Sequence, residues 1–139
     1  MGKEQCVSFL SEHGIKPTAN RIVIAETLAS ADCPMSVKEL EYRILSIDKS
    51  NIFRTLMLFK EQHLVHVIED GDGGLKYELC LSHDHKVDED EHLHFFCERC
   101  HKTICLHEIP VPIVSLPAGY ELRGISCVVK GLCPKCRKQ

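Results

Sequence analysis

Apolar positions in the N-terminal part of the chain recur at the three- and four-residue spacing of amphipathic helices. This spacing predicts four helices, over residues 4–13, 18–29, 36–45 and 48–59. Thr18 and Ser36 stand at the starts of the second and third helices, where a side-chain oxygen caps backbone amides. The segment is therefore predicted to be helical, with one buried face on each helix.

Two β-rich runs follow, at 64–68 and 75–81, and a loop of glycine and aspartate at 70–74 joins them. Such runs around a tight loop predict a β-hairpin. Helices that end in a hairpin are typical of a winged helix, in which a late helix enters the major groove of DNA. A generic small α+β domain is the alternative, because helical periodicity shows only which faces are buried.

The rest of the chain has a different pattern. Residues 82–91 are polar and acidic, which predicts a linker or an exposed loop. Short strands are predicted at 94–96 and 102–106, a short helical or irregular crossover at 110–116, and the longest strand at 120–130. The expected organisation is a winged-helix DNA-binding domain over 1–81, the acidic linker over 82–91 and a second domain over 92–139.

The length of 139 residues suits one domain or two small ones. No apolar run reaches about 18 residues, the length of a membrane span, and the first five residues resemble no secretion signal. A cytoplasmic protein without a membrane partner is therefore expected. Nine cysteines in a reducing compartment indicate metal binding more than disulfides.

The formal net charge of −3 does not indicate nucleic-acid binding. Residues 1–78 carry 9 Lys and Arg against 12 Asp and Glu, and residues 79–139 carry 8 of each. A DNA-binding interpretation must therefore depend on where a few basic residues lie.

Two Cys-x-x-Cys pairs bracket the last third of the chain, Cys97 with Cys100 and Cys133 with Cys136. Four thiolates in two such pairs can surround one tetrahedral zinc ion and leave no position for water or substrate, which makes the site structural. Gly131, just before the second pair, and Pro134, inside it, are expected to supply tight turn geometry. The alternative is a dithiol redox motif, but such motifs usually occur singly at a helix N-terminus.

A second set of nitrogen and sulfur donors precedes the first cysteine pair. His92 and His94 are two residues apart, so on a strand both imidazoles project from one face. Cys80 lies at the end of the second hairpin strand and His66 in the first. These donors suit zinc better than magnesium or manganese, so we expect a regulatory site for a second zinc or another divalent metal. The alternative is a group of solvated surface histidines.

Candidate DNA contacts cluster at the start of the fourth predicted helix. Arg54 can reach a phosphate or a guanine, and Phe53 can touch a thymine methyl. The other candidates are polar or basic residues on this helix and near the second one: Lys16, Arg21, Lys49, Ser50 and Asn51. The alternative is a capped amphipathic helix whose charges are only solvated.

Catalytic motifs are missing from the sequence. It contains no Gly-rich phosphate loop, Gly-x-Ser-x-Gly elbow or His-Glu-x-x-His pair. The chain is therefore expected not to be an enzyme and to have no small-molecule substrate beyond a metal ion.

The chain resembles the ferric uptake regulator family, dimeric metal-dependent bacterial repressors, over nearly its full length. The matching motifs are Gly14–Arg21, Ser50–Leu56, Leu64–His66, Tyr77–Cys80, His92–Cys100 and Gly131–Cys136. The resemblance implies an α+β fold, with an N-terminal winged-helix DNA-binding domain followed by a small α/β dimerisation domain that contains a four-cysteine zinc site. It also implies a homodimer that binds double-stranded operator DNA.

Within the family, the zinc uptake regulator branch is the most similar, because its sensing ligands match the four donors of the second set. The iron and peroxide sensors have a histidine where this chain has Cys33-Pro34-Met35, and a carboxylate where it has Cys105. Both departures favour zinc. Cys105, and His83 and His85 from an insertion, are possible extra ligands. Elsewhere, His101 replaces the usual glycine after the first cysteine pair.

The resemblance implies a zinc-sensing transcriptional repressor of metal-uptake genes, with one structural zinc and one regulatory ion. Three alternatives remain. The first is an iron or peroxide sensor of the same family, and the second is a zinc-ribbon adaptor that binds proteins instead of DNA. The third is a thiol redox enzyme.

Overall fold

The computed structural model describes residues 1–31, 33–69, 74–80, 93–106, 108–123 and 125–138. The chain divides into two compact units, Met1–Leu81 and Ser82–Gln139, which we call the N-terminal unit and the C-terminal unit. The predicted acidic linker lies outside the described residues. Among those that are described, no helix combines the length and the apolar composition needed to cross a membrane.

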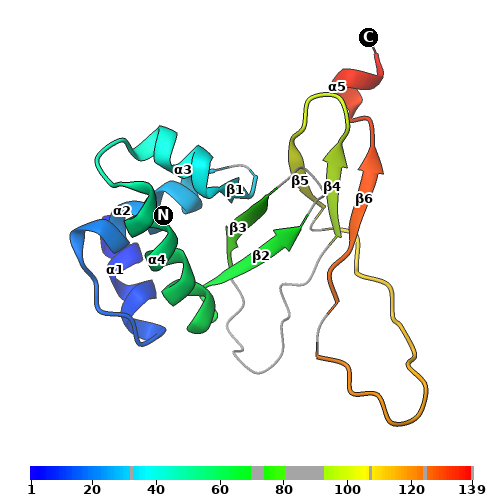
Figure 1. Cartoon of the computed structure of the whole chain (residues 1–139), viewed down its shortest axis with the longest axis horizontal. Helices are drawn as coiled ribbons and strands as arrows, with labels where there is room; N and C mark the ends of the chain where they lie inside the picture. Colours follow the sequence, from blue (N-terminus) through cyan, green and yellow to red (C-terminus); the bar gives the residue numbers. More distant parts are fainter. Residues whose placement is uncertain (32, 70–73, 81–92, 107, 124, 139) are drawn as a thin grey trace. The chain divides into compact units, whose positions relative to one another are not determined.

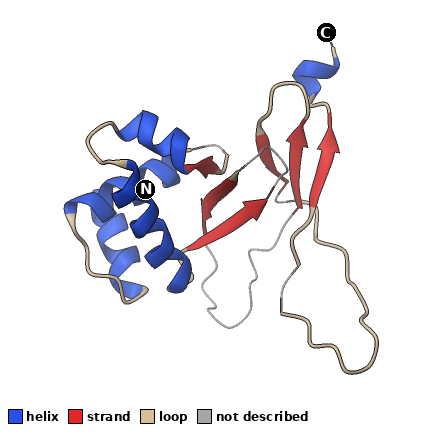
Figure 2. Ribbon diagram, viewed as in Figure 1, coloured by secondary structure: helices blue, strands red, loops and turns tan. Residues whose placement is uncertain are grey.

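The described part of the N-terminal unit contains helices and a small antiparallel sheet (Figures 1 and 2). The helices are α1 (Lys3–Glu12), α2 (Ala19–Ser30), α3 (Val37–Ile44) and α4 (Lys49–Glu61). The strands are β1 (Met35–Ser36), β2 (Val65–Glu69) and β3 (Leu75–Leu79), in the order β1-β3-β2. The four predicted helices and the hairpin are confirmed, and β1 is an additional strand that the sequence did not predict.

Two predicted helix caps are present. The Thr18 hydroxyl accepts a hydrogen bond from the backbone N–H of Arg21 at 3.3 Å. The Ser36 hydroxyl accepts one from the backbone N–H of Glu39 at 3.1 Å. Each cap satisfies an amide that the helix itself leaves unbonded, and such a cap typically stabilises a helix by about 1 kcal/mol. The starts of α2 and α3 are thus specified by local sequence.

A single apolar core lies between the helices and one face of the sheet. Leu10, Ile24, Leu56 and Phe59 are fully buried in it, and Tyr77 joins them from β3. Side chains alternate along a strand, so the neighbours of Tyr77 in β3 lie on the opposite face. That second face is where the candidate metal ligands of this unit are found.

Leu45 departs from the predicted apolar face. The helix α3 ends at Ile44, and Leu45 caps it in the left-handed region with φ +61°. Its side chain is 81% exposed, and Phe53 on α4 is 48% exposed. Apolar spacing does not reveal where a helix ends, so the prediction placed Leu45 inside the helix. The exposure of Phe53, by contrast, is what a candidate DNA contact needs.

Replacing Leu45 with glycine is expected to stabilise the N-terminal unit by about 0.5–1 kcal/mol. Relief of the left-handed backbone contributes about 1–2 kcal/mol, and the larger unfolded-state entropy of glycine offsets about 0.5–1 kcal/mol of it. Urea unfolding measures the change. Leu45→Ala is the matched control, because it removes the side chain and keeps the strained backbone. Equal stabilisation by both variants would contradict the backbone explanation.

The C-terminal unit contains β4 (Leu93–Cys97), β5 (Thr103–Leu106), β6 (Val128–Gly131) and the short helix α5 (Pro134–Arg137). The strand order is β5-β4-β6, with β4 antiparallel to β5 and parallel to β6. A long irregular segment connects β5 to β6 (Figure 1). The predicted crossover at 110–116 is thus irregular rather than helical.

The predicted strand at 120–130 is wrong for most of its length. Pairing begins only at Val128, which lies beside His94, and β4 itself begins one residue earlier, at Leu93. Among the described residues, no strand lies beside positions 120–127 to bond their backbone. An apolar run becomes a strand only where a partner strand exists.

Candidate functional site

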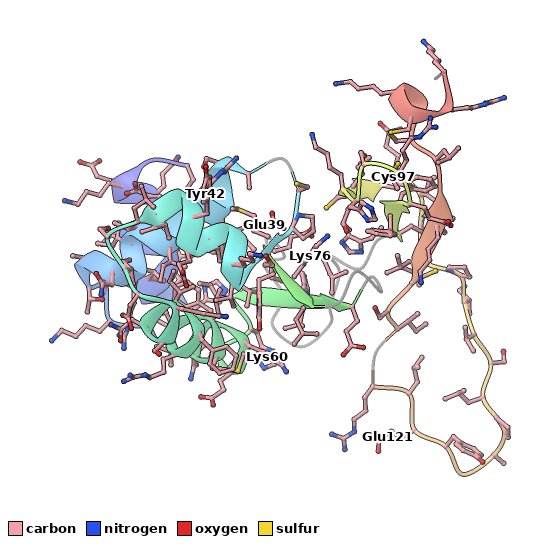
Figure 3. All side chains as sticks on the ribbon, turned by 45° about the horizontal axis from the view of Figure 1, so that its top comes forward. Glu39, Tyr42, Lys60, Lys76, Cys97 and Glu121 are labelled. Atoms are coloured by element: carbon pink, nitrogen blue, oxygen red, sulfur yellow. The ribbon has the colours of Figure 1, made fainter. Side chains whose placement is uncertain are left out.

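Four cysteine sulfurs converge at the end of the C-terminal unit that carries α5, where Figure 3 labels Cys97. The sulfurs of Cys97, Cys100, Cys133 and Cys136 all lie within 4.8 Å of one another. The Cys100 and Cys133 sulfurs are 3.9 Å apart. A tetrahedral zinc with Zn–S bonds of about 2.3 Å places its sulfurs about 3.8 Å apart. The residues therefore fit a structural zinc, as the spacing predicted.

Strand pairing explains how two cysteine pairs so distant in sequence meet. Cys97, the last residue of β4, lies beside Gly131, the last residue of β6. A Cβ at Gly131 would lie only 3.2 Å from the ring of Phe95, so a larger residue would require that ring to shift by a few tenths of an ångström. The expectation that Gly131 supplies a turn is therefore wrong, because this glycine lies in a strand and permits a close approach. Pro134 begins α5, where its missing N–H costs nothing.

Backbone amides point at the sulfurs of this cluster. The N–H of Cys133 donates to the Cys97 sulfur at 3.4 Å. Hydrogen bonds from the backbone N–H groups, first that of Cys100 and then that of Cys133, lower the pKa of Cys97 to about 6. The pKa of Cys136 is raised to about 12, chiefly by its hydrogen bond with the Cys133 side chain. Four sulfurs this close are all anionic only when a cation neutralises them, which is what Zn²⁺ does.

The turn after the first cysteine pair places a histidine in the left-handed region of the backbone. His101 adopts φ +60°, and its N–H donates to the Cys97 carbonyl at 2.9 Å. Its ring lies 5.8 Å from that of Phe96, centroid to centroid. The histidine thus occupies a conformation that glycine adopts without strain.

The N-terminal unit presents three potential ligands on one face of its sheet. His66 in β2 lies directly opposite Glu78 in β3. Cys80 lies two residues after Glu78, and its backbone N–H donates to the Leu64 carbonyl at 2.8 Å. The alternation of side chains along β3 therefore continues to Cys80, whose side chain lies on the same face as that of Glu78. All three side chains are half-buried. Within the described part of this unit, however, no three Cys, His, Asp or Glu ligand atoms converge.

Glu78 is a candidate ligand that the sequence analysis missed. Its position two residues before Cys80 on a predicted strand was the available signal, because such residues share a face. The register of the hairpin then places it opposite His66.

In the C-terminal unit, His94 in β4 lies directly opposite Cys105 in β5. Their ligand atoms are within 4.8 Å of each other. His94 is buried and Cys105 half-buried. The other predicted donors in this region, His83, His85 and His92, lie outside the described residues.

The candidate DNA contacts lie on the surface of the N-terminal unit. Lys49, Ser50, Asn51 and Arg54 are exposed at the start of α4, and Phe53 beside them is half-exposed. The Asn51 side-chain amide donates to the Asp48 carboxylate. This arrangement presents basic and polar groups together with one aromatic ring at the N-terminal end of a helix.

A second basic group lies where the chain enters α2. Lys16 is exposed, and the Arg21 guanidinium donates to the Lys16 carbonyl at 2.9 Å. The hydrogen bond holds Arg21 against the loop before the helix. Both residues stay on the surface, as a contact to a DNA backbone requires.

Comparison with known proteins gives consistent matches. The sequence model of the ferric uptake regulator family matches residues 12–114. The ferric uptake regulation protein of Campylobacter jejuni subsp. jejuni is 28% identical over 98% of this chain and 88% of that protein. The peroxide operon regulator of Bacillus subtilis is 23% identical over 98% of this chain and 94% of that protein. Among solved structures, a zinc uptake regulator complexed with zinc and DNA aligns with a TM-score of 0.69 at 18% identity, over 98% of this chain and 93% of that one.

Proposed function

The chain belongs to the ferric uptake regulator family, and on that premise we propose that it is a zinc-sensing, homodimeric repressor of metal-uptake genes that acts in the cytoplasm. It is a metal-responsive, DNA-binding transcription regulator and not an enzyme. The choice of zinc is supported by the chemistry of the candidate donors in each unit.

Sulfur and imidazole nitrogen dominate those donors. In the N-terminal unit His66 and Cys80 share one face of the β2–β3 hairpin, and in the C-terminal unit His94 lies beside Cys105. Thiolate and imidazole suit zinc, whereas manganese prefers oxygen ligands. Glu78 adds one carboxylate, which zinc also accepts. The donor set is therefore softer than an iron or manganese sensor requires.

In the proposed mechanism, His66, Cys80, His92 and His94 hold one regulatory ion. Binding of this ion favours the DNA-binding arrangement of the winged helices. The ion supplies a positive charge that several donors share. By linkage, DNA tightens the binding of this ion by the same factor by which the ion tightens DNA binding, typically about 5–150-fold. The four-cysteine zinc has a separate role, because it holds the C-terminal unit folded.

Exposed apolar side chains support the proposed homodimer. Six of them lie in the irregular segment between β5 and β6 and are 43–97% exposed: Ile109, Ile113, Val114, Leu116, Tyr120 and Leu122. Apolar side chains gathered on a surface mark a protein interface. A second copy is the proposed partner, because two winged helices then match two operator half-sites.

The proposal is tested by metal-dependent DNA binding. Zinc-loaded protein selects duplexes from a random pool, and the selected duplex is titrated with and without the regulatory ion. We expect tight binding with zinc and weak binding after mild chelation. Binding should also weaken steeply as salt rises, because phosphate contacts release counterions. If zinc-loaded protein selects no duplex, the repressor proposal is wrong.

Arg54→Ala is expected to weaken binding of the selected duplex by about 5- to 100-fold, because it removes a base or phosphate contact at the start of α4. Lys60→Ala is the matched control, since it removes the same charge from the exposed last turn of the same helix. Equal losses in the two variants would mean that α4 contributes only general charge and does not read the duplex.

An iron sensor is the second candidate, supported by the carboxylate of Glu78 opposite His66. Anaerobic titration with Fe²⁺ and Zn²⁺ in the same DNA-binding assay separates the two. The zinc proposal requires activation at lower free Zn²⁺ than free Fe²⁺. The opposite order would identify an iron sensor.

A further inference from the structure

Basic residues are concentrated around the four-cysteine cluster. Residues 97–102 and 130–138 contain six Lys and Arg and a single acidic residue, Glu98. The whole chain has 17 Lys and Arg against 20 Asp and Glu, so the remainder has 11 against 19. We call the six side chains the basic surface: Arg99, Lys102, Lys130, Lys135, Arg137 and Lys138. Positive charge thus gathers in one small part of an otherwise acidic chain.

The contacts between the two cysteine pairs bring these side chains together. Cys97 lies beside Gly131 in the β4–β6 ladder, and the Cys133 N–H donates to the Cys97 sulfur at 3.4 Å. The Arg99 guanidinium donates to the Cys136 carbonyl at 3.0 Å, so the first pair lies against the helix that carries the second. All six basic residues are exposed, and nitrogen-tipped side chains project around α5 in Figure 3.

The charge of a filled zinc site does not account for so many basic residues. Four thiolates and one Zn²⁺ carry a net charge of about −2. Six basic residues and Glu98 have a formal net charge of +5, so about three positive charges are left when the site is neutralised. Clustered positive charge on exposed side chains is typical of a surface that binds a polyanion.

We propose that the basic surface binds the phosphate backbone of duplex DNA, independently of base sequence, and that it supplies much of the non-specific DNA affinity of the chain. The inference rests on the proposed function, because it takes DNA as the polyanion. It goes further by assigning a DNA contact to the C-terminal unit.

The charge of the N-terminal unit favours DNA as the polyanion. Residues 1–78 carry 9 Lys and Arg against 12 Asp and Glu, so this part of the chain has a net negative charge that phosphates repel. The chain nevertheless belongs to a family of DNA-binding regulators. Sequence-independent attraction to a duplex must therefore come from basic residues elsewhere, and the basic surface is where they gather.

The residue types of the basic surface suit phosphates better than bases. Residues 97–102 and 130–138 contain no Asn or Gln, the side chains that read adenine. Lys and Arg contacts to phosphate position a protein on a duplex and carry no sequence information. The expected binding is therefore uniform across sequences and strongly dependent on salt.

Binding of an unselected duplex as a function of salt tests the proposal. Full-length protein that retains its structural zinc, with the regulatory ion removed by mild chelation, is titrated with a short duplex that lacks the selected sequence. The triple variant Lys135→Gln/Arg137→Gln/Lys138→Gln is expected to bind about tenfold or more weakly. The slope of log K against log salt should become shallower by about 2–3, because each lost phosphate contact removes about 0.9. Chelator-resistant zinc should stay at one per chain.

A matched control removes three charges from exposed positions of the N-terminal unit, with Lys3→Gln/Lys38→Gln/Lys60→Gln. We expect a much smaller change in affinity and in slope. Equal losses in the two triple variants would mean that only net charge matters, which would overturn the assignment to the basic surface. Lys135→Arg/Lys138→Arg keeps the charge and should bind as the native protein does. A loss in this variant would contradict the electrostatic explanation.

Poly-L-glutamate distinguishes an acidic protein partner from DNA. If the Lys135, Arg137 and Lys138 triple variant loses binding of poly-L-glutamate but keeps its duplex affinity and salt slope, the basic surface fits acidic proteins and the DNA proposal is wrong. These measurements need no selected duplex. A failure to select an operator would therefore refute the repressor proposal alone, and an unchanged salt slope would refute this inference alone.

Discussion

Replacing Cys133 with serine is expected to unfold the C-terminal unit and to leave the N-terminal unit folded. Cys133 belongs to the cluster in which four sulfurs lie within 4.8 Å of one another. The buried cluster here consists of Cys97, Cys133 and Cys136, with Phe95 and Ile104 packed against it. Leu93 and Phe96 are the other buried apolar residues in the described part of this unit. A core this small does not offset the entropy of ordering the chain, so the zinc must supply the difference.

The expected loss is large because zinc binding and folding are coupled. Apparent binding free energies for structural zinc in zinc-finger peptides are about 10–16 kcal/mol, and a missing ligand removes much of that. Hydrogen exchange on the whole protein, with a zinc count per chain, measures the outcome. Amide protection should disappear from β4 and β6 and persist in α2 and α4, which have their own apolar core.

Cys127→Ser controls for the loss of a thiol in the same unit, because Cys127 lies outside the cluster. It should keep one tightly bound zinc per chain and normal protection. If Cys133→Ser also keeps that zinc and the protection of β4, the four-cysteine site is not what holds this unit folded.

Cys80→Ser is expected to weaken zinc-dependent operator binding by about tenfold or more without loss of fold. Cys80 is half-buried at the end of the β2–β3 hairpin, on the face that carries His66 and Glu78. A serine hydroxyl is a poor zinc ligand, so the proposed sensor loses one of its sulfur donors. The backbone bond from the Cys80 N–H to the Leu64 carbonyl does not depend on the side chain, so the hairpin should persist.

The measurement is operator binding as a function of free zinc, with zinc content and unfolding of each unit recorded in parallel. The response should shift to higher free zinc, and the chelator-resistant zinc should be unchanged. Cys127→Ser again serves as the thiol control and should respond normally. A normal response in Cys80→Ser, or an unfolded N-terminal unit, would refute the assignment of Cys80 to the sensor.

Much of the fold could be predicted because its signals are local. The capping oxygens of Thr18 and Ser36 act within one turn of helix, and the cysteine pairs act within four residues. The glycine-rich loop likewise marks the hairpin from adjacent positions. Each of these signals comes from groups a few residues apart. It can therefore be recognised in the sequence without knowing which elements pack together.

The details that failed all depend on distant partners. Strand pairing, and not apolar pattern, decided that β6 begins at Val128. Gly131 lies in a strand and close to the Phe95 ring, and not in a turn. Leu45 matched the apolar spacing, yet it lies beyond the end of the helix and is exposed.

The sequence by itself determined the donor types, the four helices, the hairpin and the two cysteine pairs. Tertiary structure alone decided which donors become neighbours: the register of β2–β3 sets Glu78 opposite His66, and that of β4–β5 sets Cys105 opposite His94. The physical reason is that a shift of one residue in a strand register moves every side chain to the other face. Spacing along the chain fixes the period of a strand, but only its pairing with another strand fixes which side chains meet.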